Sequence, residues 1–248
     1  MWFNKKNILI TVFIFGIVIW SSIGTGVRPI PLDNFVAFSE RFFPPNWDRT
    51  NVALSASLIT LQVAFLGTIL ALLVAIPISF LAANNTSPNG YVYHTVRSML
   101  SFLRSVPDIV LGLFFVVLIG LGPYAAVLAI FIHNVGVLGK LIAELIESAD
   151  KGPQEAVQSM GLCKSMVALY GVLPQIIPNV LSHYFYRFEV AIRTSLILGF
   201  IGAGGIGQLL FNDFQTFRYD NVSLYVLFIM GLVVFVDMLG SYVRNRVI

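Results

Sequence analysis

Stretches of roughly 20 mostly apolar residues recur along this chain, and they limit its fold more than any other feature. Overall, 57% of the 248 residues are hydrophobic and only 11% are charged, whereas an ordinary soluble domain has about 25% charged residues. A soluble fold of this size could not hide so much apolar surface from water. We therefore predict an all-α protein, a polytopic bundle of transmembrane helices.

About six membrane spans can be placed along the sequence. The first follows Lys5 and Lys6, and because no cleavage site of the A-x-A type comes after it, we expect an uncleaved anchor. Pro77 lies inside the second span and could kink it. The predicted spans are residues 7–24, 55–83, 98–121, 123–146, 179–201 and 222–243.

The positions of Lys and Arg in the short loops predict the orientation of these spans, because such residues collect on the cytoplasmic side. Their bias favours both termini inside, in a bacterial inner (plasma) membrane. This orientation places the segment around Glu155 in the cytoplasm. The basic residues are scattered, so we expect contact with membrane lipid and no nucleic-acid partner. The residues assigned inside are Lys5, Lys6, Arg97, Lys151, Lys164, Arg244 and Arg246, and those outside are Arg28, Arg41, Arg49 and Arg218.

The segment 150–174 is a polar insert between apolar spans. Pro153 suits the first turn of a helix, and Glu155 complements the positive end of the helix dipole there. Gly161 can end this first helix, predicted at residues 154–160, and a second piece is expected at 162–172. Pro174 and Pro178 are expected to stop the second piece. The insert is thus predicted to be a helix-turn-helix at the membrane face.

This insert resembles the cytoplasmic coupling loop of binding-protein-dependent ABC importer permeases. Val157 stands where that pattern has a third small residue, and Gly171 stands where it has Ile. The positions that match in type and spacing are Glu155, Ala156, Gly161, Leu173 and Pro174. The resemblance implies that the loop inserts into a groove of an ATPase subunit and passes its motion to the membrane helices.

Two further stretches, residues 103–115 and 187–210, resemble the permeases of phosphonate-class importers, which share a methionine-importer-like fold. The resemblance implies transport of phosphonate, phosphite or a related phosphorus oxyanion by alternating access. It also implies a second permease copy or paralogue, two ATPase subunits that bind ATP and Mg²⁺, and an external phosphonate- or phosphite-binding protein. Permeases for methionine or other organic solutes share the coupling loop, so that alternative stays open.

One transmembrane permease domain is expected over residues 1–248, with an N-terminal anchor span and external loop at 1–50. The permease core is expected at 51–248 and its coupling loop at 150–174. No cofactor is expected in this chain, because it has no G-x-x-x-x-G-K-[ST] sequence for nucleotide phosphates.

The run Gly202–Gly207 reads GAGGIG, which formally satisfies a dinucleotide-binding pattern. That pattern requires a strand before it, and here it follows a membrane span, so we expect no nucleotide site. Gly199, Ala203 and Gly207 recur every four residues and would permit a close backbone approach. Gly202, Gly204, Gly205 and Gly207 are therefore candidates for an external gate, with plain helix packing as the alternative.

Charged residues inside the spans are the other candidates for function, because they are costly in hydrocarbon unless they meet a partner or water. Glu189 and Arg193 can pair at i, i+4, while Arg187 lies on roughly the opposite face. Arg104 and Asp108 flank Pro107 in the unfavourable order, so each is expected to find a partner on another span. These five charged residues could line the pathway or hold the bundle together.

Other functional classes fit the sequence less well. A secondary transporter usually has more spans, often in inverted repeats. An enzyme needs a cluster of reactive groups, and His94, His133 and His183 are widely separated, so neither a catalytic site nor a metal site is expected. A channel would leave the polar insert without a role.

Overall fold

The computed structural model describes residues 5–25 and 31–247, and in these ranges the regular structure is helical, with no strand. The chain divides into two compact units, Met1–Phe43 and Pro44–Ile248. Five helices are long and apolar enough to cross a membrane, and a bent pair of helices brings the number to six if that pair counts as one span. The predicted all-α membrane bundle is confirmed.

The first unit contains two helices. In α1 (Lys5–Thr25), the stretch Lys6–Ile23 has a mean hydropathy of 1.9 and none of it is buried. The second helix, α2 (Leu32–Phe42), has the aromatic rings of Phe38 and Phe42 stacked with their centroids 5.4 Å apart. The segment expected as a loop before residue 50 is therefore partly helical.

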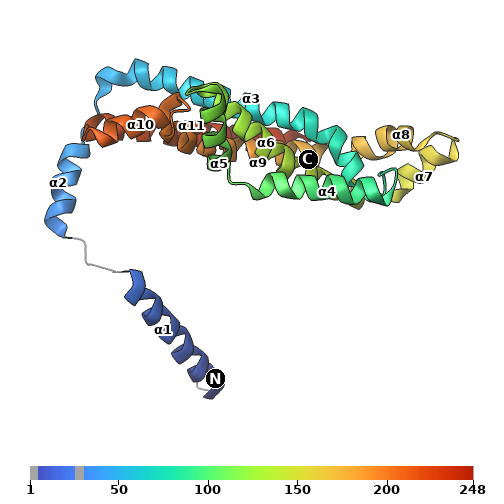
Figure 1. Cartoon of the computed structure of the whole chain (residues 1–248), viewed down its shortest axis with the longest axis horizontal. Helices are drawn as coiled ribbons and strands as arrows, with labels where there is room; N and C mark the ends of the chain where they lie inside the picture. Colours follow the sequence, from blue (N-terminus) through green and yellow to red (C-terminus); the bar gives the residue numbers. More distant parts are fainter. Residues whose placement is uncertain (1–4, 26–30, 248) are drawn as a thin grey trace. The chain divides into compact units, whose positions relative to one another are not determined.

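The second unit is a bundle in which α3, α6, α9 and α11 run alongside one another (Figure 1). Its short helices α7 and α8 lie at one end of these long helices and α10 at the other (Figure 1). The elements are η1 (Trp47–Arg49), α3 (Thr50–Ala82), α4 (Gly90–Ser105), α5 (Asp108–Ile119), α6 (Pro123–Ser148), α7 (Lys151–Ser159), α8 (Lys164–Met166), the π-helical segment η2 (Val167–Val172), α9 (Leu173–Phe200), α10 (Gly205–Gln215) and α11 (Tyr219–Val247).

Small residues on α3 form the centre of the core. Its buried face contains Ala64, Ala71 and Ala75, each with no exposed surface. An added Cβ on Gly67 would lie 2.8 Å from Cγ2 of Ile130 on α6. Helices pack closely in a membrane where small residues let their backbones approach, so this stripe explains the extensive contact between α3 and α6.

The third predicted span is wrong as a continuous helix. It begins earlier, at Gly90, where the side chain of Asn89 accepts a hydrogen bond from the N–H of Val92 at 2.8 Å. The helices α4 and α5 then meet at an angle of 85°. Pro107 has no N–H to donate, and it forces Val106 into an extended conformation (ψ 122°). The proline therefore breaks the helix at this point.

The prediction that Pro174 and Pro178 stop the second piece of the insert is also wrong. Both prolines lie inside α9, which continues from Leu173 into the fifth span. Pro174 occupies the first turn of α9, where a missing N–H costs no helical hydrogen bond. The wider π-helical turns of Val167–Val172 come directly before it. The second half of the insert, from Lys164, and the fifth span are thus one continuous helical path.

Candidate functional site

The polar insert presents a short exposed helix, α7. Asp150 caps it, because its carboxylate accepts a hydrogen bond from the N–H of Gly152 at 3.1 Å. Glu155 and Ala156 are exposed on α7. After the helix, Gly161 adopts a φ of +78°, a conformation that favours glycine. The predicted helix and glycine turn are present, and the candidate docking residues are accessible to a partner.

Gly171, which departs from the expected pattern, lies where the two limbs of the insert cross. An added Cβ on Gly171 would lie 3.1 Å from Cα of Gln154 and 3.4 Å from the carbonyl oxygen of Pro153. An isoleucine would push α7 away from the π-helical segment. Glycine at this position therefore lets α7 pack directly against the chain that leads into α9.

Gln175 ties the base of α7 to the start of α9, and the sequence analysis missed it. Its Oε1 accepts a hydrogen bond from the N–H of Asp150 at 3.0 Å, and its Nε2 donates to the carbonyl oxygen of Asp150 at 3.2 Å. The same amide group donates to Gly171. On α7, Gln154 donates to the carbonyl oxygens of Ala149 and Asp150, at 3.2 and 3.0 Å. Leu173 and Pro174 lie beside this connection, in the first turn of α9.

The break between α4 and α5 is occupied by polar groups from three helices. His133 Nδ1 lies 3.1 Å from the carbonyl oxygen of Val106 and 3.0 Å from Oδ1 of Asp108. The other carboxylate oxygen of Asp108 accepts a hydrogen bond from Thr194 on α9 at 3.0 Å. The expectation that Asp108 has partners on other spans is confirmed.

A second polar chain joins α9 to α3 through α6. Arg187 donates to Oδ1 of Asn134, with an Nε–Oδ1 distance of 2.9 Å and a further contact from Nη2. The amide group of Asn134 donates in turn to Thr68 at 3.3 Å. Asn134 is 1% exposed, so this chain fixes Arg187 against the bundle.

The remaining intramembrane charges lie elsewhere. Arg193 pairs with Glu189 on α9 as the i, i+4 spacing predicts, and the Arg193 side chain is 57% exposed. Arg104 is exposed near the end of α4 and takes no part in the Asp108 cluster. The five candidate charges therefore do not form one site.

The glycine-rich run reverses the chain between α9 and α10. Gly202, Gly204 and Gly205 all have φ between +72° and +89°, which glycine adopts at little cost. The run lies on two helices and the turn between them. The expected close approach is present, since an added Cβ on Gly207 would lie 2.2 Å from the carbonyl oxygen of Leu196.

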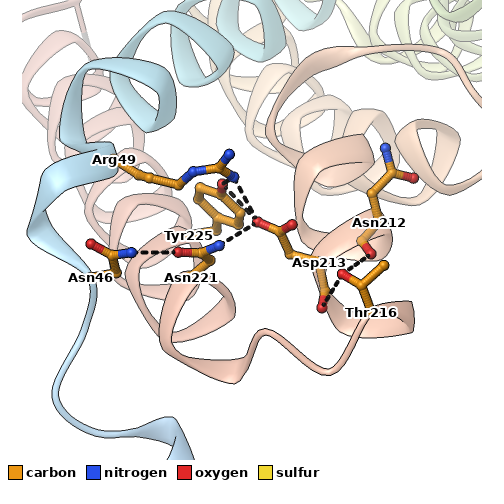
Figure 2. Close-up of polar contacts among 7 residues, drawn as sticks. All are labelled: Asn46, Arg49, Asn212, Asp213, Thr216, Asn221 and Tyr225. Atoms are coloured by element: carbon orange, nitrogen blue, oxygen red, sulfur yellow. Dashed lines mark hydrogen bonds and ion pairs between the residues drawn. The ribbon is translucent and has the colours of Figure 1, made fainter.

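Near the C-terminal end of α10, a buried carboxylate joins η1, at the start of α3, to α11, as Figure 2 shows. Oδ2 of Asp213 accepts hydrogen bonds from Arg49, Asn221 and Tyr225, each at 3.0 Å. Asn46 extends the cluster by donating to Asn221 at 3.0 Å. Sequence reasoning missed it because Arg49 and Asp213 are 164 residues apart and no local pattern links them.

Within the two described ranges, no three His, Cys, Asp or Glu side chains gather as metal ligands would. The candidate site is therefore made of exposed docking residues at one end of the bundle and polar clusters along it. Such an arrangement can transmit motion along the bundle and present polar groups to a solute.

Comparison with known proteins gives a consistent result. Residues 75–248 match the family model of the binding-protein-dependent transport system inner membrane component. The chain is 36% identical over 213 residues to the phosphate-import permease protein PhnE of Mycolicibacterium smegmatis, a match that covers 86% of this chain and 40% of that protein. The chain therefore spans less than half the length of that relative.

Other relatives are similar over most of their length. The putative phosphite transport system permease protein HtxC of Stutzerimonas stutzeri is 34% identical over 86% of this chain and 75% of that protein. Among solved structures, an inward-facing conformation of the MetNI methionine ABC transporter has a TM-score of 0.74, with 19% identity over 82% of this chain and 99% of that one. At this low identity the structural match shows a shared fold.

Proposed function

The chain belongs to the family of binding-protein-dependent transport system inner membrane components, and from this premise we propose that it is the permease subunit of an ATP-driven importer for phosphorus oxyanions. Phosphonate, phosphite and phosphate are the cargo class. The observation that supports this choice most is the 34–36% identity to phosphate and phosphite permeases over 86% of the chain. The protein is a multi-pass inner-membrane protein, and we place both of its termini in the cytoplasm.

The exposed end of α7 is the docking point for the ATPase. Glu155 and Ala156 face outward on this helix, and Gly161 allows the chain to return at once to the bundle. Because Gln175 holds the base of α7 to α9, a push on α7 moves the fifth span with it. Two ATPase subunits, one under each of two permease copies or paralogues, would drive alternating access in this way.

The opposite end of the bundle receives cargo from an external binding protein. There the turn of Gly202, Gly204 and Gly205 leads into α10, which is fixed to α3 and α11 through Asp213. This α10 segment forms the external gate. Between the two ends, Arg187 is a candidate to contact an oxyanion, since guanidinium groups suit phosphorus oxygens.

Variants of the docking helix test the ATPase assignment. Glu155→Lys and Gly161→Val should abolish uptake and lower the amount of ATPase that co-purifies, while the chain still reaches the membrane. Glu40→Lys changes an exposed acid on α2, and Gly231→Val fills open space in α11, so these variants should transport normally. Normal uptake by both docking variants would show that α7 is not the docking point for the ATPase.

Uptake assays test the cargo. Cells with the cognate binding protein and ATPase should accumulate phosphonate, phosphite or phosphate in a way that depends on this chain. Transport of methionine alone would overturn the choice of phosphorus oxyanions while leaving the importer assignment in place.

A further inference from the structure

A polar pocket lies between α4 and α6, outside the polar clusters described above. It has a volume of about 370 Å³ and is lined by Tyr93, His94, Arg97, Ser98, Ser101 and Lys140. Two of these side chains are cations and none is a carboxylate. A cationic pocket in a membrane helix pair calls for an explanation, because charge is costly there without a partner or water.

The pocket belongs to a polar face that runs along both helices. On α4, His94, Ser98 and Ser101 are spaced four and three residues apart, so they share one side of the helix. The other side of α4 contains Leu100, which is 1% exposed and packs in the core. On α6, Lys140 lies seven residues after His133 and so shares its side of that helix. This face leads from the pocket toward the break where His133 meets Asp108.

The charge of Arg97 is already balanced. Its guanidinium group is 2.7 Å from Glu147 and 4.0 Å from Glu144. It also lies over the ring of Tyr93, 5.3 Å from the centroid. Neither glutamate lines the pocket. Arg97 is thus a wall of the pocket whose charge is already paired with carboxylates that do not line it.

Lys140 is the cation without a counter-charge. It is half-buried, and within residues 5–25 and 31–247 no carboxylate lies within 4.0 Å of its ammonium group. In the same part of the chain the hydroxyl groups of Ser98 and Ser101 make no hydrogen bond, whereas Ser105 on the same helix donates to Phe102 at 2.7 Å. One free ammonium group and two free hydroxyl donors therefore face a shared space.

We propose that this pocket is an oxyanion-binding subsite of the pathway, in which Lys140 and the hydroxyl groups of Ser98 and Ser101 hold a tetrahedral phosphorus oxyanion. Lysine binds phosphate as a point charge, and each hydroxyl group can donate one hydrogen bond to an oxygen. The assignment of the bound oxyanion to the cargo rests on the proposed function. A phospholipid headgroup has the same chemistry, so the experiment must separate the two sources.

Binding of radiolabelled inorganic phosphate to the purified full chain in phosphatidylcholine nanodiscs tests the subsite. The ATPase is omitted because it binds phosphate groups itself. Lys140→Gln should weaken binding at least about tenfold, since a hydrogen bond to a charged group is worth that much. Ser98→Ala combined with Ser101→Ala should also weaken it, and Lys140→Arg should restore most of it. Arg246→Gln removes an exposed cation on α11 and should change nothing.

Equal binding by the wild-type chain, Lys140→Gln and the serine double variant would overturn the subsite. Thermal unfolding of each variant shows whether it is folded. If Lys140→Gln does not fold, the serine double variant still tests the subsite. A second set of nanodiscs contains phosphatidylglycerol. Phosphate binding should persist there, and its displacement by the anionic lipid would overturn the assignment to the cargo.

Uptake assays separate this inference from the proposed function. If the chain imports phosphorus oxyanions but its phosphate binding does not depend on Lys140, the subsite is refuted and the proposed function stands. If phosphate binding depends on Lys140 but the chain imports no phosphorus oxyanion, the proposed function and the assignment of the bound oxyanion to the cargo are both refuted.

Discussion

His133 Nδ1 on α6 lies 3.0 Å from Oδ1 of Asp108, the first residue after the break between α4 and α5. The same ring nitrogen is 3.1 Å from the carbonyl oxygen of Val106, just before the break. One imidazole therefore bridges both sides of an 85° bend. Thr194 adds a third helix to this contact.

The first prediction is that Asp108 and His133 stabilise the bundle as a pair. Asp108→Ala should destabilise it by about 1–3 kcal/mol, because the buried hydroxyl group of Thr194 loses its acceptor and His133 loses its carboxylate partner. In a double-mutant cycle, Asp108→Ala and His133→Ala should be non-additive by at least about 0.5 kcal/mol. Unfolding in detergent measures both values. Strict additivity would show that the two residues do not interact.

The second prediction concerns the contact of α9 with α10. Gly207→Ala places a methyl group 2.2 Å from the backbone oxygen of Leu196, where no flexible side chain can move away. We expect Gly207→Ala to lower the free energy of unfolding by more than the usual cost of an overpacked site, which is about 1–3 kcal/mol. Gly231→Ala adds the same group where nothing lies within 4 Å. Thermal stability of the two variants should differ clearly, and similar melting temperatures would contradict the close approach.

The third prediction is that Gln175 carries motion from α7 to α9. Gln175→Leu removes the hydrogen bonds to Asp150 and Gly171 while leaving an apolar side chain at this position. The ATPase should still co-purify, because Glu155 and Ala156 are untouched, yet uptake per ATP hydrolysed should fall. Asn179→Leu replaces an exposed amide one turn further along α9 and serves as the control. An unchanged ratio of transport to hydrolysis in Gln175→Leu would exclude this role.

The fourth prediction concerns Asp213, at the end of the bundle opposite α7. Asp213→Ala leaves three hydrogen-bond donors, Arg49, Asn221 and Tyr225, without their shared acceptor. We expect a cost of about 1–3 kcal/mol, because the buried donors Asn221 and Tyr225 lose their acceptor. Asp213→Asn keeps an acceptor oxygen and should lose less stability than Asp213→Ala. Denaturation of both variants in detergent measures the difference, and equal stability of Asp213→Ala and the wild type would refute the role of this carboxylate.

Sequence alone was sufficient for features that depend on short stretches of chain. The spans follow from the length of apolar runs, the glycine turn at Gly161 from its place after a short polar helix, and the Glu189–Arg193 pair from i, i+4 spacing. Pro107 was visible as a proline inside an apolar run, but the predicted third span continued through it, where the structure has an 85° break. Each of these is a local property of the helix.

Tertiary structure decided which residues meet across helices. Gly171 reads as a departure from a pattern until α7 is seen crossing it, and Asp213 has no signal that points to Arg49, 164 residues away. The prolines at 174 and 178 read as stops, yet α9 continues through them after a π-helical segment. The local sequence determines the period and length of each helix. The partner of a side chain depends on how the helices pack against one another, and the local pattern does not contain that information.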